Sequence, residues 1–193
     1  MKLVDYLKEM YASRNIMLYC DIETFQYNEE NGRKQPSEYK NMTFSVACSW
    51  NVDDIVYKEV FPNFKALFDI VIAVYQKERK KPKIVLNFHN GNKYDNHFLR
   101  KDLLYYYPHM SVENMFLMTA TTNESNATAL RLKDLKKEDK EGIILEKRIK
   151  SSINLELTFF LYGIQFETVD NWVKTNCSIA TLGKKMKDIG ALS

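Results

Sequence analysis

One amphipathic segment between two β-rich runs limits the fold of this chain more than any other feature. Residues 63–80 repeat apolar side chains at helical spacing from Phe64 to Tyr75, which predicts a helix with one buried face. The runs 55–61 and 84–88 on either side are rich in β-branched and aromatic residues, and the second is apolar enough for a buried strand. A helix between two strands predicts a mixed α/β protein with a central β-sheet flanked by helices.

The other expected elements follow from the same patterns. The basic run 77–83 is expected to place cations at the C-terminal end of the 63–80 helix, and a turn at 51–54 to join two strands as a hairpin. Residues 27–41 and 135–142 are polar and are expected to form loops. The full set comprises helices over 2–13, 63–80, 95–107 and 179–189, and strands over 16–21, 44–50, 55–61, 84–88, 115–122, 128–132, 142–149, 154–162 and 164–169.

Composition narrows the class of protein. The chain has 193 residues, 45% of them hydrophobic and 13% aromatic, which predicts one domain spanning residues 1–193. A net charge of +3 permits contact with nucleic acid without arguing for it, and three widely spaced cysteines suggest neither disulfides nor a zinc site. No apolar run is long enough to span a bilayer and no signal peptide is evident, so we expect no membrane contact and a cytoplasmic location.

Two acidic residues, Asp21 and Glu23, lie in a run that otherwise predicts a buried strand. Residues i and i+2 of a strand project to the same face, so the two carboxylates are expected side by side. Burying them without a partner would cost several kcal/mol, and a divalent cation between them removes that cost. Oxygen ligands favour Mg²⁺ or Mn²⁺. The alternative is that the strand ends at Cys20 and both carboxylates are solvated in a loop.

A second group of polar residues follows the strand 84–88. His89, Asn90, Tyr94 and Asp95 lie where this strand runs into the next expected helix, which places a third carboxylate at a strand-to-helix junction. Ordinary turn chemistry is the alternative here, because His-Asn-Gly-Asn favours a turn and Asp95 could cap the helix.

Together the two groups resemble a known family. The segment D21-I-E23-T24 is similar to the Exo I motif of DnaQ-like 3′–5′ exonucleases, and N90-GNK-Y94-D95 is similar to Exo II of family B DNA polymerases. The surroundings of the second motif most resemble the N-terminal exonuclease domain of protein-primed polymerases of phages and plasmids. This resemblance implies an RNase H-like fold and, for a phage protein, a location in the host cytoplasm.

The resemblance also implies an activity and roles for individual residues. Asp21, Glu23 and Asp95 would be catalytic and would hold two Mg²⁺ or Mn²⁺ ions that hydrolyse the 3′ end of single-stranded DNA. The residues expected to contact the nucleic acid are Thr24, His89, Asn90, Tyr94 and, from a weaker match at S178-IATL182, Ser178. Ser178 is equally suited to cap the last helix. A terminal protein would be a partner through the full-length polymerase.

The sequence departs from the family at its third motif, in which a Tyr is followed four residues later by a catalytic Asp. No such pair occurs, and the nearest imitations end at Asp102 and Asp170, to which we assign no metal. We therefore expect a polymerase fragment without the third motif and the polymerase domain, or a short relative with impaired catalysis.

Two other functions stay open. One is a binding module that contacts single-stranded nucleic acid or a protein without cutting, and the other is a ribonuclease on the same fold. Basic runs at 77–83, 133–140 and 184–187 could follow phosphates, although runs of this length are usually solvated.

Overall fold

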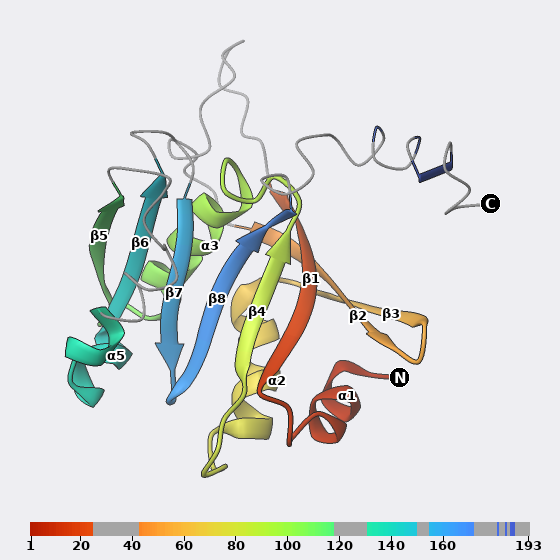
Figure 1. The fold of residues 1–193 in the computed structure, drawn as a ribbon, viewed down its shortest axis with the longest axis horizontal. Helices are drawn as coiled ribbons and strands as arrows, with labels where there is room; N and C mark the ends of the chain where they lie inside the picture. The colour runs from red at the N-terminus through yellow and green to blue at the C-terminus, as the bar shows by residue number, and fades with distance from the viewer. Residues whose placement is uncertain are drawn as a thin grey trace.

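The residues that the structure describes form an eight-stranded mixed β-sheet with helices packed against it (Figure 1). The computed structural model describes residues 1–24, 43–117, 131–149 and 155–171, together with Thr181, Lys184, Met186 and Lys187. The elements are α1 (Leu3–Glu9), β1 (Asn15–Thr24), β2 (Thr43–Val52), β3 (Ile55–Phe61), α2 (Phe64–Tyr75), β4 (Lys83–Phe88), α3 (Asp95–Tyr106), β5 (Ser111–Leu117), α5 (Lys137–Gly142), β6 (Ile143–Ile149), β7 (Leu155–Leu161) and β8 (Ile164–Asp170).

The sheet has the strand order β3-β2-β1-β4-β8-β7-β6-β5. Strands β1, β2 and β3 form an antiparallel meander, whereas β1, β4 and β8 run parallel to one another. Parallel neighbours need a crossover connection, and α2 lies in the connection that leads to β4. The strand that carries Asp21 therefore lies inside the sheet, between β2 and β4.

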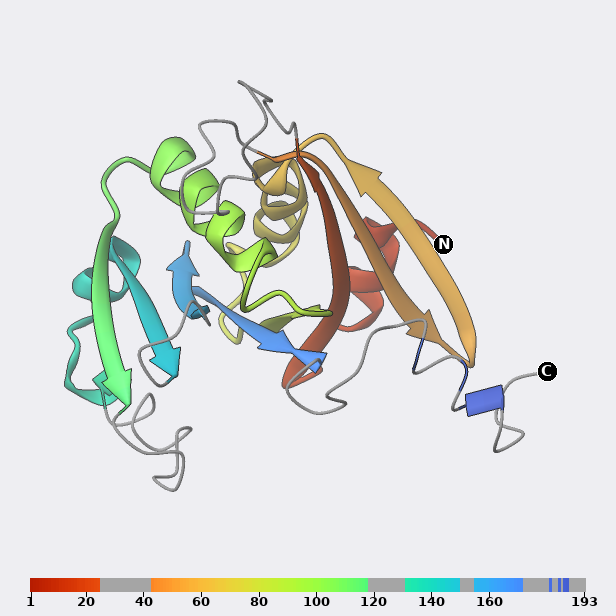
Figure 2. The ribbon, with the colours of Figure 1, turned by 90° about the horizontal axis from the view of Figure 1, so that it is seen from above.

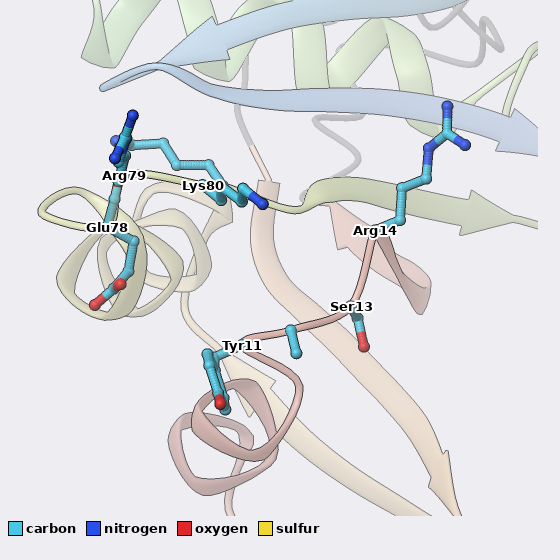
Figure 3. A pocket seen from close by; sticks show the side chains of 8 residues that line it. Tyr11, Ser13, Arg14, Glu78, Arg79 and Lys80 are labelled. Carbon is cyan, nitrogen blue, oxygen red and sulfur yellow. The ribbon is translucent and has the colours of Figure 1, made fainter.

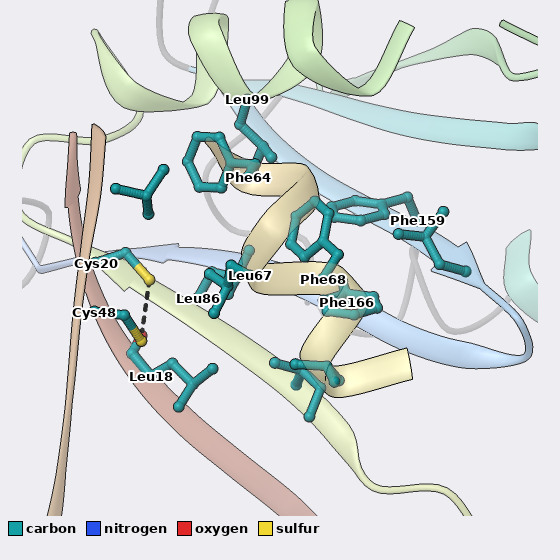
Figure 4. Close-up of a cluster of buried hydrophobic side chains, with 14 of the residues drawn as sticks. Leu18, Cys20, Cys48, Phe64, Leu67, Phe68, Leu86, Leu99, Phe159 and Phe166 are labelled. Carbon is teal, nitrogen blue, oxygen red and sulfur yellow. Dashed lines mark hydrogen bonds between the residues drawn. The ribbon is translucent and has the colours of Figure 1, made fainter. Parts of the chain in front are cut away.

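The hydrophobic core lies between the sheet and α2. Figures 1 and 2 show α2 and α3 on the same side of the sheet, and α1 packs beside α2. Phe68 of α2 is buried, and its ring centroid lies 5.6 Å from that of Phe159 and 4.9 Å from that of Phe166 (Figure 4). These edge-on aromatic contacts join the helix to β7 and β8.

Several predicted elements are confirmed. The hairpin of β2 and β3 is present, with Val52 paired to Ile55 across a turn whose residues Asp53 and Asp54 both have positive φ. Asp tolerates this left-handed backbone better than most residues, which suits it to a tight hairpin turn. The helix starting at Asp95 and the strands expected over 84–88 and 164–169 are also found, with small differences at their ends.

Other predictions were wrong in detail. The 63–80 helix ends at Tyr75, so the basic run 77–83 lies mostly in the connection to β4 and not at the end of a helix. Neighbouring like charges repel one another in a helix, and Pro82 disfavours helical backbone before it. The strand expected over 128–132 is wrong at residues 131 and 132, which belong to a helical turn over 131–134. Leu, Arg and Lys are good helix formers, which favours this outcome.

Further differences lie in the second half of the chain. Most of the loop expected over 135–142 is the short helix α5. Of the helix expected over 179–189, the structure describes only Thr181, Lys184, Met186 and Lys187, and these four are helical. The loop expected over 27–41 lies outside the described residues, and so does Ser178.

Candidate active site at the carboxyl edge of the sheet

Three parallel strands bring the two sequence motifs to one edge of the sheet. Tyr19 of β1 pairs with Asn87 of β4, and Phe88 of β4 pairs with Asp170 of β8. Parallel strands end at the same edge, and Figure 1 shows β4 and β8 pointing the same way. The last residues of β1, the connection from β4 to α3 and the end of β8 therefore meet there, which is where open α/β sheets commonly bind ligands.

Asp21 and Glu23 lie on the same face of β1, as predicted, but this face is exposed. Burial alternates along the strand, so that Cys20 and Ile22 point into the core while both carboxylates point to solvent. The expectation of a buried strand was wrong for this face, and the strand continues to Thr24 instead of ending at Asp21. Pairing with β2 extends it, since Ile22 pairs with Val46. The pair consequently avoids most of the cost of burying charge.

Asp95 is the buried acidic residue of the second motif. It begins α3 and is 5% exposed. The pKa of Asp95 is raised to about 7, mainly by burial and then by the neighbouring Asp21 carboxylate, with a smaller contribution from Asp170. Hydrogen bonds from the backbone amides of Asp95 and Ile22 oppose the rise in pKa. Because Asp21 contributes to the raised pKa, carboxylates from the two motifs are close enough to repel each other.

A direct hydrogen bond also joins the two motifs. The hydroxyl oxygens of Thr24 and Tyr94 lie 2.7 Å apart, although the residues are 70 positions apart in the sequence. The Tyr94 ring packs against Phe98, with 5.0 Å between the ring centroids. Thr24 and Tyr94 are thus held at the junction of β1 and α3.

Asp170 fixes the connection between β4 and α3. This residue ends β8 and is 3% exposed. Its Oδ1 accepts a hydrogen bond from the backbone N–H of Asn90 at 2.8 Å, and its Oδ2 accepts one from that of Asn92 at 3.1 Å. The sequence assigned Asp170 no metal, and in the structure this residue holds the backbone of the second motif.

The same connection requires special backbone geometry at two residues. Asn90 has a φ of 65°, which Asn adopts more readily than most residues. A Cβ atom added to Gly91 would collide with the Cβ of Phe88, so only glycine fits without movement of the chain. The sequence did not indicate either of these backbone requirements, because His-Asn-Gly-Asn predicts only a turn.

A cleft of about 440 Å³ opens beside Asp21 on the exposed face of the sheet. His89 lines it together with residues from β1, β2, β3 and β4. Sequence reasoning missed several lining residues, because cross-strand neighbours cannot be identified without the register of the sheet. These residues are Tyr19, Ser49, Lys58, Asn87 and Asn171.

The structure brings together most of the predicted site. One strand end carries Asp21, Glu23 and Thr24, and the adjoining connection and helix start carry His89, Asn90, Tyr94 and Asp95. Within the described ranges, no three Asp, Glu, His or Cys side chains are grouped closely enough to hold a metal ion. Asp21, Glu23 and Asp95 are candidate metal ligands through their carboxylate oxygens alone, since they do not form such a group in this structure.

Comparison of the chain with protein-family models, curated proteins and solved structures returned no match. In the parts of the chain that the structure describes, no helix is long and apolar enough to cross a membrane.

Proposed function

We propose that this chain is a 3′–5′ exonuclease domain with an RNase H-like fold, of the kind found in protein-primed family B DNA polymerases. The observation that carries the proposal is the meeting of the two motifs. Asp21 raises the pKa of Asp95, and Thr24 is hydrogen-bonded to Tyr94. The interior position of β1, between an antiparallel and a parallel neighbour, supports the RNase H-like assignment.

The donor chemistry of the site fits a hard divalent cation. Asp21, Glu23 and Asp95 offer only carboxylate oxygens, which Mg²⁺ and Mn²⁺ prefer. The repulsion between Asp21 and Asp95 is the kind that a nearby cation relieves. When bound, such ions would supply an activated water and charge stabilisation for phosphodiester hydrolysis.

The other residues of the site would bind and orient the 3′ end. Tyr94 presents an aromatic ring, which stacks on any base and so suits a nuclease without sequence preference. The Oδ1 atom of Asn90 is buried and accepts no hydrogen bond from the described residues, so contact with the substrate would require this side chain to turn outward. His89 lines the cleft beside Asp21, where it can contact the sugar or phosphate.

A cleavage assay tests the proposal. A 5′-labelled single-stranded DNA is incubated with Mg²⁺ or Mn²⁺ and the wild-type chain or the variant Asp21→Asn/Glu23→Gln. Both carboxylates are exposed, so the variant is expected to fold. We expect stepwise shortening from the 3′ end, slower in the variant by a factor of about 100 or more, on the scale seen when a charge-stabilising group is removed from an active site.

The matched control is Asp53→Asn/Asp54→Asn. It removes two carboxylates at the hairpin turn, where Asn also tolerates positive φ, and should leave cleavage unchanged. Equal cleavage by the wild type and the Asp21/Glu23 variant would refute the assigned site. Binding of the oligonucleotide without cleavage by the wild type would instead favour the non-cutting binding module, and preferential cleavage of an RNA oligonucleotide would favour a ribonuclease.

A further inference from the structure

A second hollow lies at the opposite edge of the sheet from the candidate active site. It has a volume of about 810 Å³ and lies between the α1–β1 and α2–β4 connections. Figure 3 shows Tyr11 and Ser13 on one connection and Arg79 and Lys80 on the other. Both connections lead into the starts of parallel strands, whereas Asp21 lies near the end of β1.

A backbone hydrogen bond joins the two connections, and a second one shapes the α1–β1 connection. The N–H of Lys83 donates to the carbonyl oxygen of Arg14 at 3.0 Å, which joins the end of the basic run to the start of β1. The N–H of Ser13 donates to the carbonyl oxygen of Met10 at 2.9 Å and turns the chain after α1. The hollow is therefore built by the fold, since its two walls come from segments far apart in the sequence.

The lining of the hollow is strongly basic. Arg14, Arg79, Lys80 and Lys81 contribute four cations, and Glu78 is the acidic residue that lines it. Arg14, Arg79 and Lys80 are exposed, and no carboxylate of the described residues forms an ion pair with any of the three. By contrast, Lys83 pairs with Glu167 at 2.9 Å. Cations without acidic partners around a hollow form a region of positive potential that attracts anions.

An exposed aromatic ring accompanies these cations. Tyr11 is 69% exposed and lines the hollow together with Arg79 and Lys80. Guanidinium groups bind phosphate through two parallel hydrogen bonds, and an exposed aromatic face stacks on a base.

We propose that this hollow binds the phosphate backbone of a single-stranded nucleic acid, with Tyr11 stacked on a base. The site is separate from the candidate active site, since six residue steps along β1 from Asn15 to Asp21 span about 20 Å. Binding at the hollow requires neither a metal ion nor cleavage, so it can be tested independently of the proposed exonuclease activity.

The test is the salt dependence of binding to a fluorescent single-stranded oligonucleotide, measured by anisotropy in EDTA with the full chain. With about four phosphate contacts, the slope of log K against log salt concentration is expected to be about −2.8, and in Arg79→Gln/Lys80→Gln about −1.4. Between about 50 and 200 mM salt the wild type would then lose affinity about 50-fold and the variant about 7-fold.

The matched control is Lys136→Gln/Lys137→Gln. It removes the same charge from two exposed lysines at the start of α5 and should leave the slope unchanged. Tyr11→Leu should weaken binding about fivefold or more at every salt concentration without changing the slope, because it removes stacking and no charge. Equal slopes for the wild type and the Arg79/Lys80 variant would overturn the proposal, and so would equal competition by inorganic phosphate and by unlabelled oligonucleotide.

A final variant separates this proposal from the exonuclease. Asp21→Asn/Glu23→Gln should show the wild-type slope of log K against log salt concentration even if it abolishes cleavage. A clearly shallower slope in this variant would also overturn the proposal that the hollow is the binding site. Conversely, absence of cleavage by the wild type leaves the binding test fully valid.

Discussion

The hydrogen bonds of Asp170 lead to a prediction about how the second motif is held in place. Replacing Asp170 with Asn keeps the shape of the side chain and one acceptor oxygen, but puts an NH₂ group where the second oxygen was. One of the two backbone N–H groups, that of Asn90 or that of Asn92, then faces another donor. A buried N–H without an acceptor is costly, so the variant should be less stable.

The size of the effect follows from the geometry. Hydrogen bonds to charged groups contribute about 1.5–3 kcal/mol each, and the buried Asp170 accepts two of them. Losing one and weakening the other should lower the free energy of unfolding by about 2–4 kcal/mol. For a chain of this size, the melting temperature would fall by about 5–15 °C. Removing the charge of Asp170 also removes its repulsion with Asp95, which offsets a small part of the decrease in stability.

Urea denaturation and amide hydrogen exchange measure the two consequences. Exchange at Asn90 and Asn92 should accelerate more than exchange in the core strands, because the connection opens locally. The control is Asp69→Asn, which makes the same chemical change in an exposed ion pair with Lys65 and should cost about 0.5 kcal/mol or less. If both variants lose the same stability, or if exchange at Asn90 is unaltered, the assigned role of Asp170 is wrong.

Three further predictions concern single side chains. In EDTA, Asp95→Asn should stabilise the protein more at about pH 8 than at about pH 5. The pKa of Asp95 is raised to about 7, so between about pH 4 and pH 7 the folded chain keeps a proton that the unfolded chain loses. The stability of the wild type therefore falls as the pH rises through this range, and the variant lacks this loss. Urea titrations at the two pH values measure this, and an equal difference between variant and wild type at both would contradict it. Tyr94→Phe removes the hydrogen bond to Thr24 and should lower the free energy of unfolding by about 1 kcal/mol, while the double variant with Thr24→Val should cost less than the sum of the two single changes; additive losses in this double-mutant cycle would show that the bond contributes nothing. Glu146→Gln should lower the unfolding free energy by about 3 kcal/mol, since the fully buried carboxylate pairs with Arg100 and, at 3.2 Å, with Arg148; a thermal melt indistinguishable from that of the wild type would contradict it.

Local sequence patterns predicted those parts of the fold that depend on neighbouring residues. The strand expected over 55–61 has the observed bounds, because Asp53 and Asp54 form a turn and the apolar run that follows is short. The predicted end of β1 was wrong. The strand was expected to end at Asp21, but pairing of Ile22 with Val46 extends it to Thr24. The sequence of β1 carries no signal of its partner strand.

The sequence indicated which residues could form the candidate site, but not which of them are buried or what they contact. The spacing of Asp21 and Glu23 correctly indicated a shared face, yet only the fold shows that this face is exposed and that Asp95 is buried. The hydrogen bonds of Asp170 depend on parallel pairing of β4 with β8, which no local pattern reveals. The position of Lys58 in the lining of the cleft could not be predicted for a similar reason. The register of the β1–β2–β3 meander brings this residue of β3 to the cleft, and the sequence does not reveal that register.

The long separation between Asn90 and Asp170 has a consequence for the order of folding. The two residues are 80 positions apart, so the hydrogen bond between them closes a large loop and costs more entropy than the local β2–β3 hairpin. During synthesis, β4 has only β1 beside it until β8 emerges, and its other edge stays open to pairing with another chain. The connection after β4 acquires its final shape only when β8 docks. A nascent chain would therefore have a formed hairpin and α2 before it has a formed site.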